Sequence, residues 1–335
     1  MDAKLIGMDE IRAAQQRIAG VAVRTGLYEL DRQRLVPAGF AVDAKMPRIW
    51  IKAENEQPIG SFKLRGAYNK IASLDADALE RGVITYSSGN HAQGVAYAAR
   101  VLGTKAVIVM PSTSPRIKQE ATKKLGGEVV LVGPASSERR AKAEELQREH
   151  GYTMVPPYDD DVVIAGAATC GVEILEQNPQ VQVILSPVGG GGLLSGISTA
   201  VKWMSPQVQV FGVEPELAGD ATESFARKRL VEWPFEKTSM TVADGLRTQS
   251  MGERNFAHVM RYADGVFTVS EEEILCATKL VIAATEMVAE PSGAVALACA
   301  LFHWKDLLAA QDVAVVLSGG NLDPALKERL LGTAE

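Results

Sequence analysis

One lysine stands in a short segment bounded by glycines, Gly60–Gly66. An alternating apolar run at 49–54 predicts a strand before it, and residues 64–74 predict a helix after it, with Ser61 as the cap. Lys63 then lies in the first helical turn, where the helix dipole disfavours a charged ammonium. A neutral amine is a nucleophile toward a carbonyl carbon. Lys63 is therefore a candidate covalent catalyst, although a solvated surface lysine fits the same local sequence.

Four consecutive glycines occupy residues 189–192, between a buried-strand pattern at 181–187 and a helical pattern at 194–204. Backbone without side chains can direct its N–H groups, together with the helix N-terminus, at a phosphate. A flexible turn is the alternative, but four glycines make an entropically costly turn. The spacing matches neither the dinucleotide fingerprint nor the P-loop. Glu214 follows the next strand as a ribose-binding acid would, so an NAD-dependent dehydrogenase stays open here, but it does not explain Lys63.

A second strand-to-helix junction, at residues 86–94, carries the polar side chains of Ser87, Ser88, Asn90 and His91. Such residues commonly cap a helix. Four of them within five positions exceed what capping needs, and a group of donors at a helix N-terminus can hold a carboxylate. The ring of His91 can equally be a structural donor.

A serine and two glycines, Ser318 to Gly320, end the last predicted strand. In open α/β sheets, ligands bind at the carboxyl ends of the strands. We therefore expect Ser318 to lie beside the glycine run and the polar junction. Together with Lys63 these motifs supply an amine, a phosphate site, a carboxylate site and a neutral hydroxyl.

The elements that must position these residues alternate between short apolar strands and helices, which indicates parallel sheets with right-handed crossovers. The predicted fold class is α/β, with two open, mostly parallel twisted sheets flanked by helices. Residues 1–72 and 158–335 are expected to form a large domain and residues 73–157 a small mobile domain, with the boundary at Pro156 and Pro157. Residues 214–265 are expected to be irregular. The remaining predictions are strands at 82–86, 105–110, 128–132, 208–213 and 313–317, and helices at 8–19, 91–102, 115–125, 136–150, 162–177, 271–289 and 292–309.

Composition excludes several classes of protein. The chain has 335 residues and a net charge of -6, which argues against a nucleic-acid partner. No apolar run reaches membrane-spanning length and the first residues lack a signal-peptide core, so no membrane partner is expected. Three separated cysteines indicate buried thiols in a reducing compartment, and four histidines show no zinc-binding spacing. The expectation is a soluble, cytoplasmic protein.

The combination of motifs resembles the fold-type II pyridoxal-phosphate enzymes, and among them the serine/threonine dehydratase (ammonia-lyase) and serine racemase family. The similarity extends over about residues 8–325. Its motifs, in this order, are highly specific to the family, whereas any one of them alone is not. They lie at residues 61–67, 87–94, 156–160, 189–193, 243–245 and 318–321.

The resemblance implies that the large domain binds pyridoxal 5'-phosphate, that Lys63 holds it covalently, and that the same amine later moves the substrate α-proton. Phe62 would lie against the cofactor ring, Asn90 would meet its phenolic oxygen and Ser318 its pyridine nitrogen. A hydroxyl does not hold the pyridine ring protonated, so the ring is a weaker electron sink, which favours prompt loss of a β-hydroxyl. The phosphate would be held by Gly189, Gly190, Gly191, Gly192 and Leu193.

The same resemblance implies that the substrate carboxylate binds to Ser87, Ser88, Asn90 and His91. Racemases of the family use a serine at the position of Ser88 on the face of the α-carbon opposite the lysine. Ser88 is therefore a candidate second catalytic residue, and otherwise a carboxylate donor only.

A divalent cation, Mg²⁺ or Ca²⁺, is implied at Glu214, the carbonyl oxygen of Ala218 and Asp220, because oxygen-only ligands suit these ions. By spacing alone the segment is a solvated acidic turn. The match also removes Glu214 from a dinucleotide-binding role.

The activity implied is elimination of water and ammonia from a small L-hydroxyamino acid, threonine or serine, to give a 2-oxo acid, in a homodimer. Serine racemase remains an alternative with the same site because of Ser88. Threo-3-hydroxyaspartate dehydratase remains another because Arg247 could serve a second carboxylate, although Arg247 can equally be structural. A β-replacing synthase is disfavoured by His91, where such relatives usually have threonine. The chain departs from the family at Ala167-Ala168, where relatives usually have Gln-Gly, and this leaves the substrate pocket open.

Overall fold

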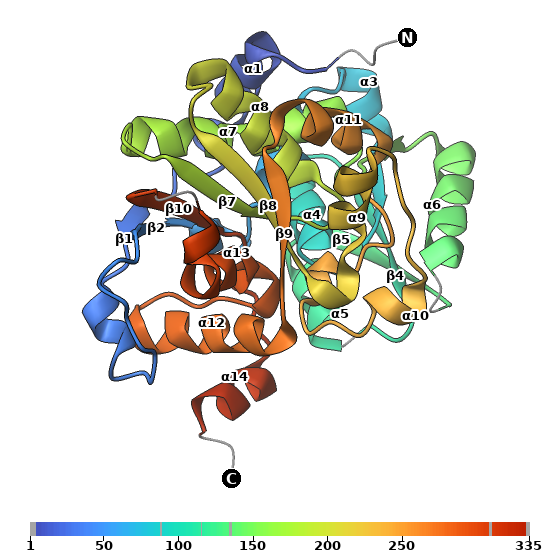
Figure 1. Ribbon diagram of the computed structural model, residues 1–335. Coiled ribbons are helices and arrows are strands. Elements are labelled where there is room, and N and C mark those ends of the chain that lie inside the picture. Colours follow the sequence, from blue (N-terminus) through green and yellow to red (C-terminus); the bar gives the residue numbers. More distant parts are fainter. Residues whose placement is uncertain (1–4, 88, 115, 134–135, 308–309, 333–335) are drawn as a thin grey trace.

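The computed structural model describes residues 5–87, 89–114, 116–133, 136–307 and 310–332 (Figure 1). Its strands form a six-stranded sheet in the order β1-β2-β10-β7-β8-β9 and a four-stranded sheet in the order β5-β4-β3-β6. The strands are β1 Leu27–Glu29, β2 Arg48–Ala53, β3 Val83–Tyr86, β4 Ala106–Pro111, β5 Gly127–Val132, β6 Thr153–Met154, β7 Val183–Pro187, β8 Gln209–Pro215, β9 Gly265–Val269 and β10 Asp312–Leu317.

Helices separate these strands along the chain. They are α1 Met8–Ile18, α2 Lys63–Ala72, α3 Ala76–Arg81, α4 Asn90–Leu102, α5 Arg116–Lys124, α6 Ser136–His150, α7 Asp161–Gln177, α8 Gly192–Met204, α9 Asp220–Arg227, α10 Phe235–Thr238, α11 Glu253–Tyr262, α12 Glu271–Ala284, α13 Pro291–Phe302 and α14 Pro324–Leu331.

Paired strands of the described residues run parallel, except that β1 is antiparallel to β2. The predicted class, two open and mostly parallel sheets flanked by helices, is confirmed. β10 lies between β2 and β7, with Ala314 opposite both Trp50 and Ile184. The last strand of the sequence is thus an inner strand of the larger sheet.

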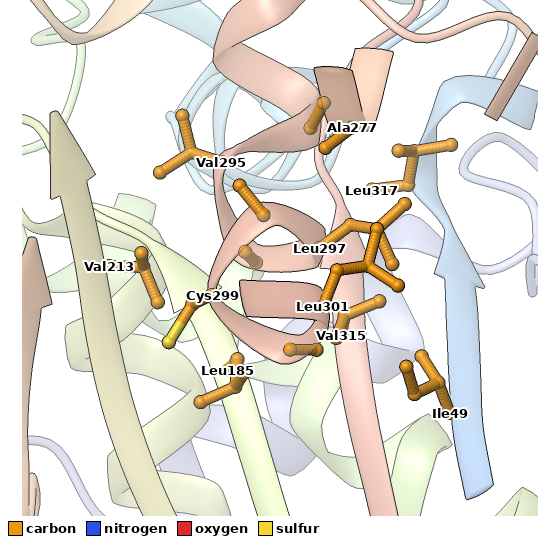
Figure 2. Packing of buried hydrophobic residues seen from close by; sticks show 14 of the residues in the cluster. Ile49, Leu185, Val213, Ala277, Val295, Leu297, Cys299, Leu301, Val315 and Leu317 are labelled. Carbon is orange, nitrogen blue, oxygen red and sulfur yellow. The ribbon is translucent and has the colours of Figure 1, made fainter. Parts of the chain in front are cut away.

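Alternate residues of the inner strands bury their side chains on opposite faces, as the two-residue period of a strand requires. Val315 and Leu317 pack with α12 and α13, whereas Ala314 and Val316 pack with α7 and α8. Helix α13 is buried from Pro291 to Leu301, as its nearly all-apolar sequence requires. Figure 2 shows its side chains against those of Leu185, Val213 and Val315.

Glycines allow the helices under the site to approach closely. A Cβ on Gly196 of α8 would lie 2.5 Å from the backbone nitrogen of Ala168 on α7. A Cβ on Gly166 of α7 would lie 2.5 Å from the carbonyl oxygen of Arg65 on α2. Helix α2 also packs against α4, so it lies between the two sheets and its first turn is held from both sides.

Several predicted boundaries are wrong. Residues 214–265 were expected to be irregular but contain α9, α10 and α11. The helix expected at 271–289 ends at Ala284, because the Thr285 hydroxyl donates to the Val281 carbonyl and accepts from the N–H of Met287, which competes with the helical pattern. Within the described ranges, no helix is both long and apolar enough to cross a membrane.

Candidate active site

Lys63 is the first residue of α2 and lies beside the end of β10. The N–H of Phe62 donates to the carbonyl oxygen of Ser318 at 3.1 Å, and Ser61 forms a bridge with Gly319. Ser61 was expected to cap α2, but Phe62 holds the cap position, and the Ser61 hydroxyl is buried with no partner among the described residues. This pairing brings the amine-bearing turn and the Ser318 strand end together.

The Lys63 amine donates to the carbonyl oxygen of Pro157 at 2.8 Å. Burial lowers its pKa to about 8, because desolvation disfavours the ammonium form. Such an amine has a much larger neutral fraction near pH 7 than an ordinary lysine. The Lys63 amine can therefore act as a nucleophile and as a proton acceptor.

The glycine run forms the bend between β7 and α8. Gly191 has a φ of +93°, which favours glycine, and Gly192 is the first residue of α8. A Cβ on Gly190 would lie 2.3 Å from the ring of Tyr158, so a side chain there would displace that ring. Because Tyr158 follows Pro157, one short segment contacts both the glycine bend and the Lys63 amine.

Two buried polar atoms border the same bend with no partner among the described residues. They are the hydroxyl of Thr248 and the side-chain carbonyl oxygen of Asn255. A Cβ on Gly189 would lie 3.4 Å from the Thr248 hydroxyl, and one on Gly191 would lie 2.9 Å from the Asn255 Cβ. A side-chain-free bend at the start of α8, with a spare hydroxyl beside it, fits a phosphate group.

The polar junction lies at the N-terminus of α4, which begins at Asn90. The hydroxyl of Ser87 accepts from the N–H of Gly89 at 3.4 Å. The Asn90 side chain donates to Glu290 and accepts from Asn321. Ser88, the candidate second catalytic residue, lies outside the described residues.

The ring of His91 contacts the backbone of the smaller sheet. Its Nε2 lies 2.9 Å from the Val155 carbonyl oxygen, which can only accept, so Nε2 carries the hydrogen. Burial, with the nearby charge of Lys63, lowers the His91 pKa to about 3, and the ring is neutral. Its Nδ1 therefore bears no hydrogen and cannot donate to a carboxylate, whereas the His91 backbone N–H lies in the first turn of α4.

Glu290 is a site residue that the sequence motifs missed. It is 7% exposed and precedes Pro291 at the start of α13, and its N–H donates to the Gly319 carbonyl oxygen. Burial, followed by the charge of Asp244, raises its pKa to about 7. The sequence feature that could have drawn attention to Glu290 is a charged residue directly before a proline at the start of an apolar helix.

The predicted cation ligands are close together. Glu214 is the next-to-last residue of β8, Ala218 lies in the short turn Glu216–Ala218, and Asp220 begins α9. The Glu214 carboxylate accepts the N–H groups of Ala221 and Thr222, while Oδ2 of Asp220 is buried with no partner in the described chain. Burial and the charge of Asp220 raise the Glu214 pKa to about 8, and burial raises that of Asp220 to about 7. Over the described residues, no group of three or more His, Cys, Asp or Glu could hold a metal.

Strand order explains this arrangement. The neighbouring strands β10, β7 and β8 end in Ser318, the glycine bend and Glu214, and the Lys63 segment bridges to the end of β10. The Arg247 guanidinium donates to the carbonyl oxygen of Thr241 at 2.7 and 3.0 Å, so these hydrogen bonds stay within its own segment.

Comparison with known proteins identifies the group to which this arrangement belongs. The chain is 40% identical to an L-threonine ammonia-lyase of Thermotoga maritima, over 98% of this chain and 78% of that protein. It is 39% identical to an L-threo-3-hydroxyaspartate ammonia-lyase of Saccharomyces cerevisiae, over 82% of this chain and 83% of that one. Its structure matches that of a serine racemase from Dictyostelium discoideum with a TM-score of 0.86 at 34% identity, covering 95% and 99% of the two chains.

These three relatives resemble the present chain to nearly the same extent, and they are named for three different activities. Residues 30–319 match the sequence pattern of one family. With that match, the chain belongs to the pyridoxal-phosphate dependent enzymes.

Proposed function

We propose that the protein is an ammonia-lyase that converts a small L-hydroxyamino acid, threonine or serine, to a 2-oxo acid and ammonia. The observation that carries the proposal is the placement of the Lys63 amine between the Ser318 strand end and the segment that contacts the glycine bend. The relatives named for threonine and for hydroxyaspartate support an elimination reaction on a hydroxyamino acid.

Pyridoxal phosphate, when bound, supplies an electron sink that stabilises negative charge at the substrate α-carbon. The residues proposed to hold it are Lys63, Phe62, Asn90, Ser318, Gly189, Gly190, Gly191, Gly192 and Leu193. Ser318 would offer the pyridine nitrogen of the cofactor a neutral hydroxyl in place of a carboxylate. A neutral hydroxyl at this position favours early departure of the β-hydroxyl over reactions that need a long-lived carbanion.

Lys63 is proposed to take the substrate α-proton on its Nζ. A general base must be unprotonated at working pH, and a pKa of about 8 leaves roughly a tenth of the amine neutral at pH 7. The Pro157 carbonyl, which accepts from Nζ, would keep the amine near the glycine bend before the cofactor binds.

The substrate carboxylate is proposed to bind at the N-terminus of α4. Ser87 supplies its hydroxyl, Asn90 and His91 supply their backbone N–H groups in the first turn of α4, and Ser88 has the role implied by the family resemblance. The first-turn N–H groups and the helix dipole favour an anion there.

A divalent cation, Mg²⁺ or Ca²⁺, is proposed at Glu214, the Ala218 carbonyl and Asp220. The residues fit: two carboxylates are buried close together, and Oδ2 of Asp220 lacks a partner in the described chain. The Asp220 carboxylate also accepts the backbone N–H of Met251. The Met251 side chain lies beside the glycine bend, 3.5 Å from where a Cβ on Gly191 would be. The cation would thus stabilise the loop that packs against the glycine bend.

We also propose how the chain is organised into domains and subunits. Residues 1–72 and 158–335 form a large domain, and residues 73–157 form a small domain that closes over the substrate and excludes water. The enzyme is proposed to be a cytoplasmic homodimer. Size-exclusion chromatography with light scattering tests the dimer.

The test begins with the purified protein and pyridoxal phosphate. We expect a visible absorption band, and borohydride reduction should fix the cofactor on the Lys63 peptide found by mass spectrometry. Lys63→Ala should lose both signals, whereas Lys279→Ala, at an exposed position on α12, should keep them. A colourless protein that instead binds NAD would refute the proposal.

A substrate panel then separates the related activities. L-Threonine, L-serine, D-serine and threo-3-hydroxyaspartate are incubated with and without Mg²⁺, and oxo-acid and enantiomer are measured. We expect oxo-acid from threonine or serine. Preference for hydroxyaspartate, or release of D-serine without oxo-acid, would show that one of the related activities is the main one.

A further inference from the structure

Glu290 has a fixed backbone and a side chain that does not serve its own helix. It occupies the N-cap position of α13, yet its carboxylate makes no capping hydrogen bond. Its N–H donates to the Gly319 carbonyl oxygen at 3.1 Å. The carboxylate instead accepts from Nδ2 of Asn90 at 2.6 Å. The Glu290 side chain therefore contacts a residue of another helix, Asn90 at the start of α4.

This contact is one end of a directed chain of hydrogen bonds. Nδ2 of Asn321 donates to the Ile59 carbonyl oxygen at 3.0 Å and to Oδ1 of Asn90 at 2.7 Å. Nδ2 of Asn90 then donates to Glu290. The backbone carbonyl at one end can only accept, and the Glu290 carboxylate at the other end accepts in its ionised form. With Glu290 ionised, the two ends determine which way both amide groups face.

Glycine at position 319 makes room for this arrangement. A Cβ there would lie 2.2 Å from Oε1 of Glu290 and 3.2 Å from Nδ2 of Asn90. Both groups thus lie against Gly319, next to Ser318. Burial, followed by the charge of Asp244, raises the Glu290 pKa to about 7, while Asn90 and the charge of Lys118 lower it.

We propose that Glu290 is a positioning residue that holds the Asn90 amide with its second N–H directed at the phenolic oxygen of the cofactor. The inference rests on the proposed function, because that function assigns the phenolic oxygen to Asn90. In the described part of the chain, Nδ2 of Asn90 makes one hydrogen bond, to Glu290, so its second hydrogen remains for a ligand.

The proposal has a spectroscopic consequence. Without an acceptor at position 290, the Asn90 amide can rotate and present its oxygen to the phenolic oxygen, which must then carry a proton. The visible absorption band of the bound cofactor should lose intensity in favour of a near-ultraviolet band. Loss of one charge-assisted hydrogen bond should also raise the cofactor dissociation constant about tenfold or more.

The test compares holoenzymes of wild type, Glu290→Gln and Glu290→Ala, with Glu286→Ala as an exposed control in the same connection. Absorption spectra and cofactor dissociation constants are measured, together with the thermal midpoints of the cofactor-free proteins. Glu290→Gln keeps an acceptor oxygen and should resemble wild type. Glu290→Ala should shift the band and weaken binding, and the control should do neither.

Two outcomes would overturn the inference: a Glu290→Ala holoenzyme with the wild-type spectrum and affinity, or a Glu290→Gln variant as impaired as Glu290→Ala. A purely structural residue would change only the thermal midpoint. If Glu290→Ala does not fold, Glu290→Asp, which withdraws the acceptor by one methylene, should show the same changes in smaller degree, and its failure to do so would overturn the inference. A colourless wild type would refute the proposed function itself.

Discussion

Two pairs of buried carboxylates belong to the six-stranded sheet and its helices, and among the described residues cationic side chains contact one pair but not the other. Arg65 is fully buried and makes paired hydrogen bonds to Glu54, at 2.7 and 2.8 Å, and to Glu173, also at 2.7 and 2.8 Å. Lys52 adds a contact of 2.6 Å to Glu173. Burial alone would raise the Glu54 pKa, but Arg65 and Lys52 outweigh it and the pKa is lowered.

The second pair, Glu214 and Asp220, receives backbone N–H groups instead of cationic side chains. Both pKa values are raised, to about 8 and about 7, so the pair is costly to ionise at neutral pH. The first group is complete, because cationic side chains neutralise its carboxylates. The second group is incomplete, and the divalent cation that we propose, or protons, would neutralise it. Lys63 is a third case, because burial lowers the pKa of its amine and its partner among the described residues is a backbone carbonyl.

The largest loss of stability is expected from removing Arg65, the central cation of the complete group. Arg65→Met keeps much of the volume but leaves Glu54 and Glu173 with only Lys52 as a cation. We expect a loss of about 3–5 kcal/mol in unfolding free energy, because uncompensated buried charge is strongly destabilising. Urea unfolding measures it, with exposed Arg12→Met as the control. A loss below about 1 kcal/mol would contradict the view that Arg65 balances these carboxylates.

Glu214 and Asp220, the incomplete group, should gain stability when a cation is added. Adding Mg²⁺ or Ca²⁺ at a hundred times its dissociation constant should stabilise the wild type by about 2.7 kcal/mol. Asp220→Asn should abolish that response, and without the cation it should be no less stable than wild type at pH 8, because a buried charge has been removed. Thermal midpoints with the cation and with EDTA test this. Glu216→Gln, at an exposed acid of the same segment, should respond like wild type.

Lys63 sharpens the comparison through pH. Because its pKa is lowered to about 8, the amine is neutral above that pH and protonated below it. The rate of covalent cofactor attachment to cofactor-free enzyme should therefore fall about tenfold for each pH unit below 8 and level off above it. Stopped-flow absorbance at fixed cofactor concentration gives the profile. A rate that kept rising to pH 10 would mean that the amine has an ordinary pKa.

The smallest change in stability should come from breaking an ion pair at the protein surface. Lys118 on α5 contacts Asp244 at 2.7 Å, with both side chains partly exposed. Lys118→Ala should change stability by less than about 1 kcal/mol, and the difference should shrink in high salt. A loss as large as that of Arg65→Met would overturn the distinction between buried and exposed charge.

Sequence patterns predicted the two sheets and the common edge at which Lys63, the glycine bend and Ser318 meet. These features follow from local alternation and from the rule that parallel strands end at one edge. The contacts made by Glu290 and His91 were not predictable in this way, because their partners lie 200 and 64 residues away in the sequence. The four-residue Arg65 group was missed for the same reason, since nothing local to Glu173 indicates a buried arginine.

The position of β10 has a consequence for synthesis of the protein. The chain leaves the ribosome with β2 and β7 already made, but their neighbouring edges pair with each other only through a strand that begins at Asp312. Until that strand arrives, a nascent chain has two open sheet edges and no Ser318. Cofactor capture should therefore follow translation of β10, and until then the unpaired edges of β2 and β7 are open to pairing with other strands.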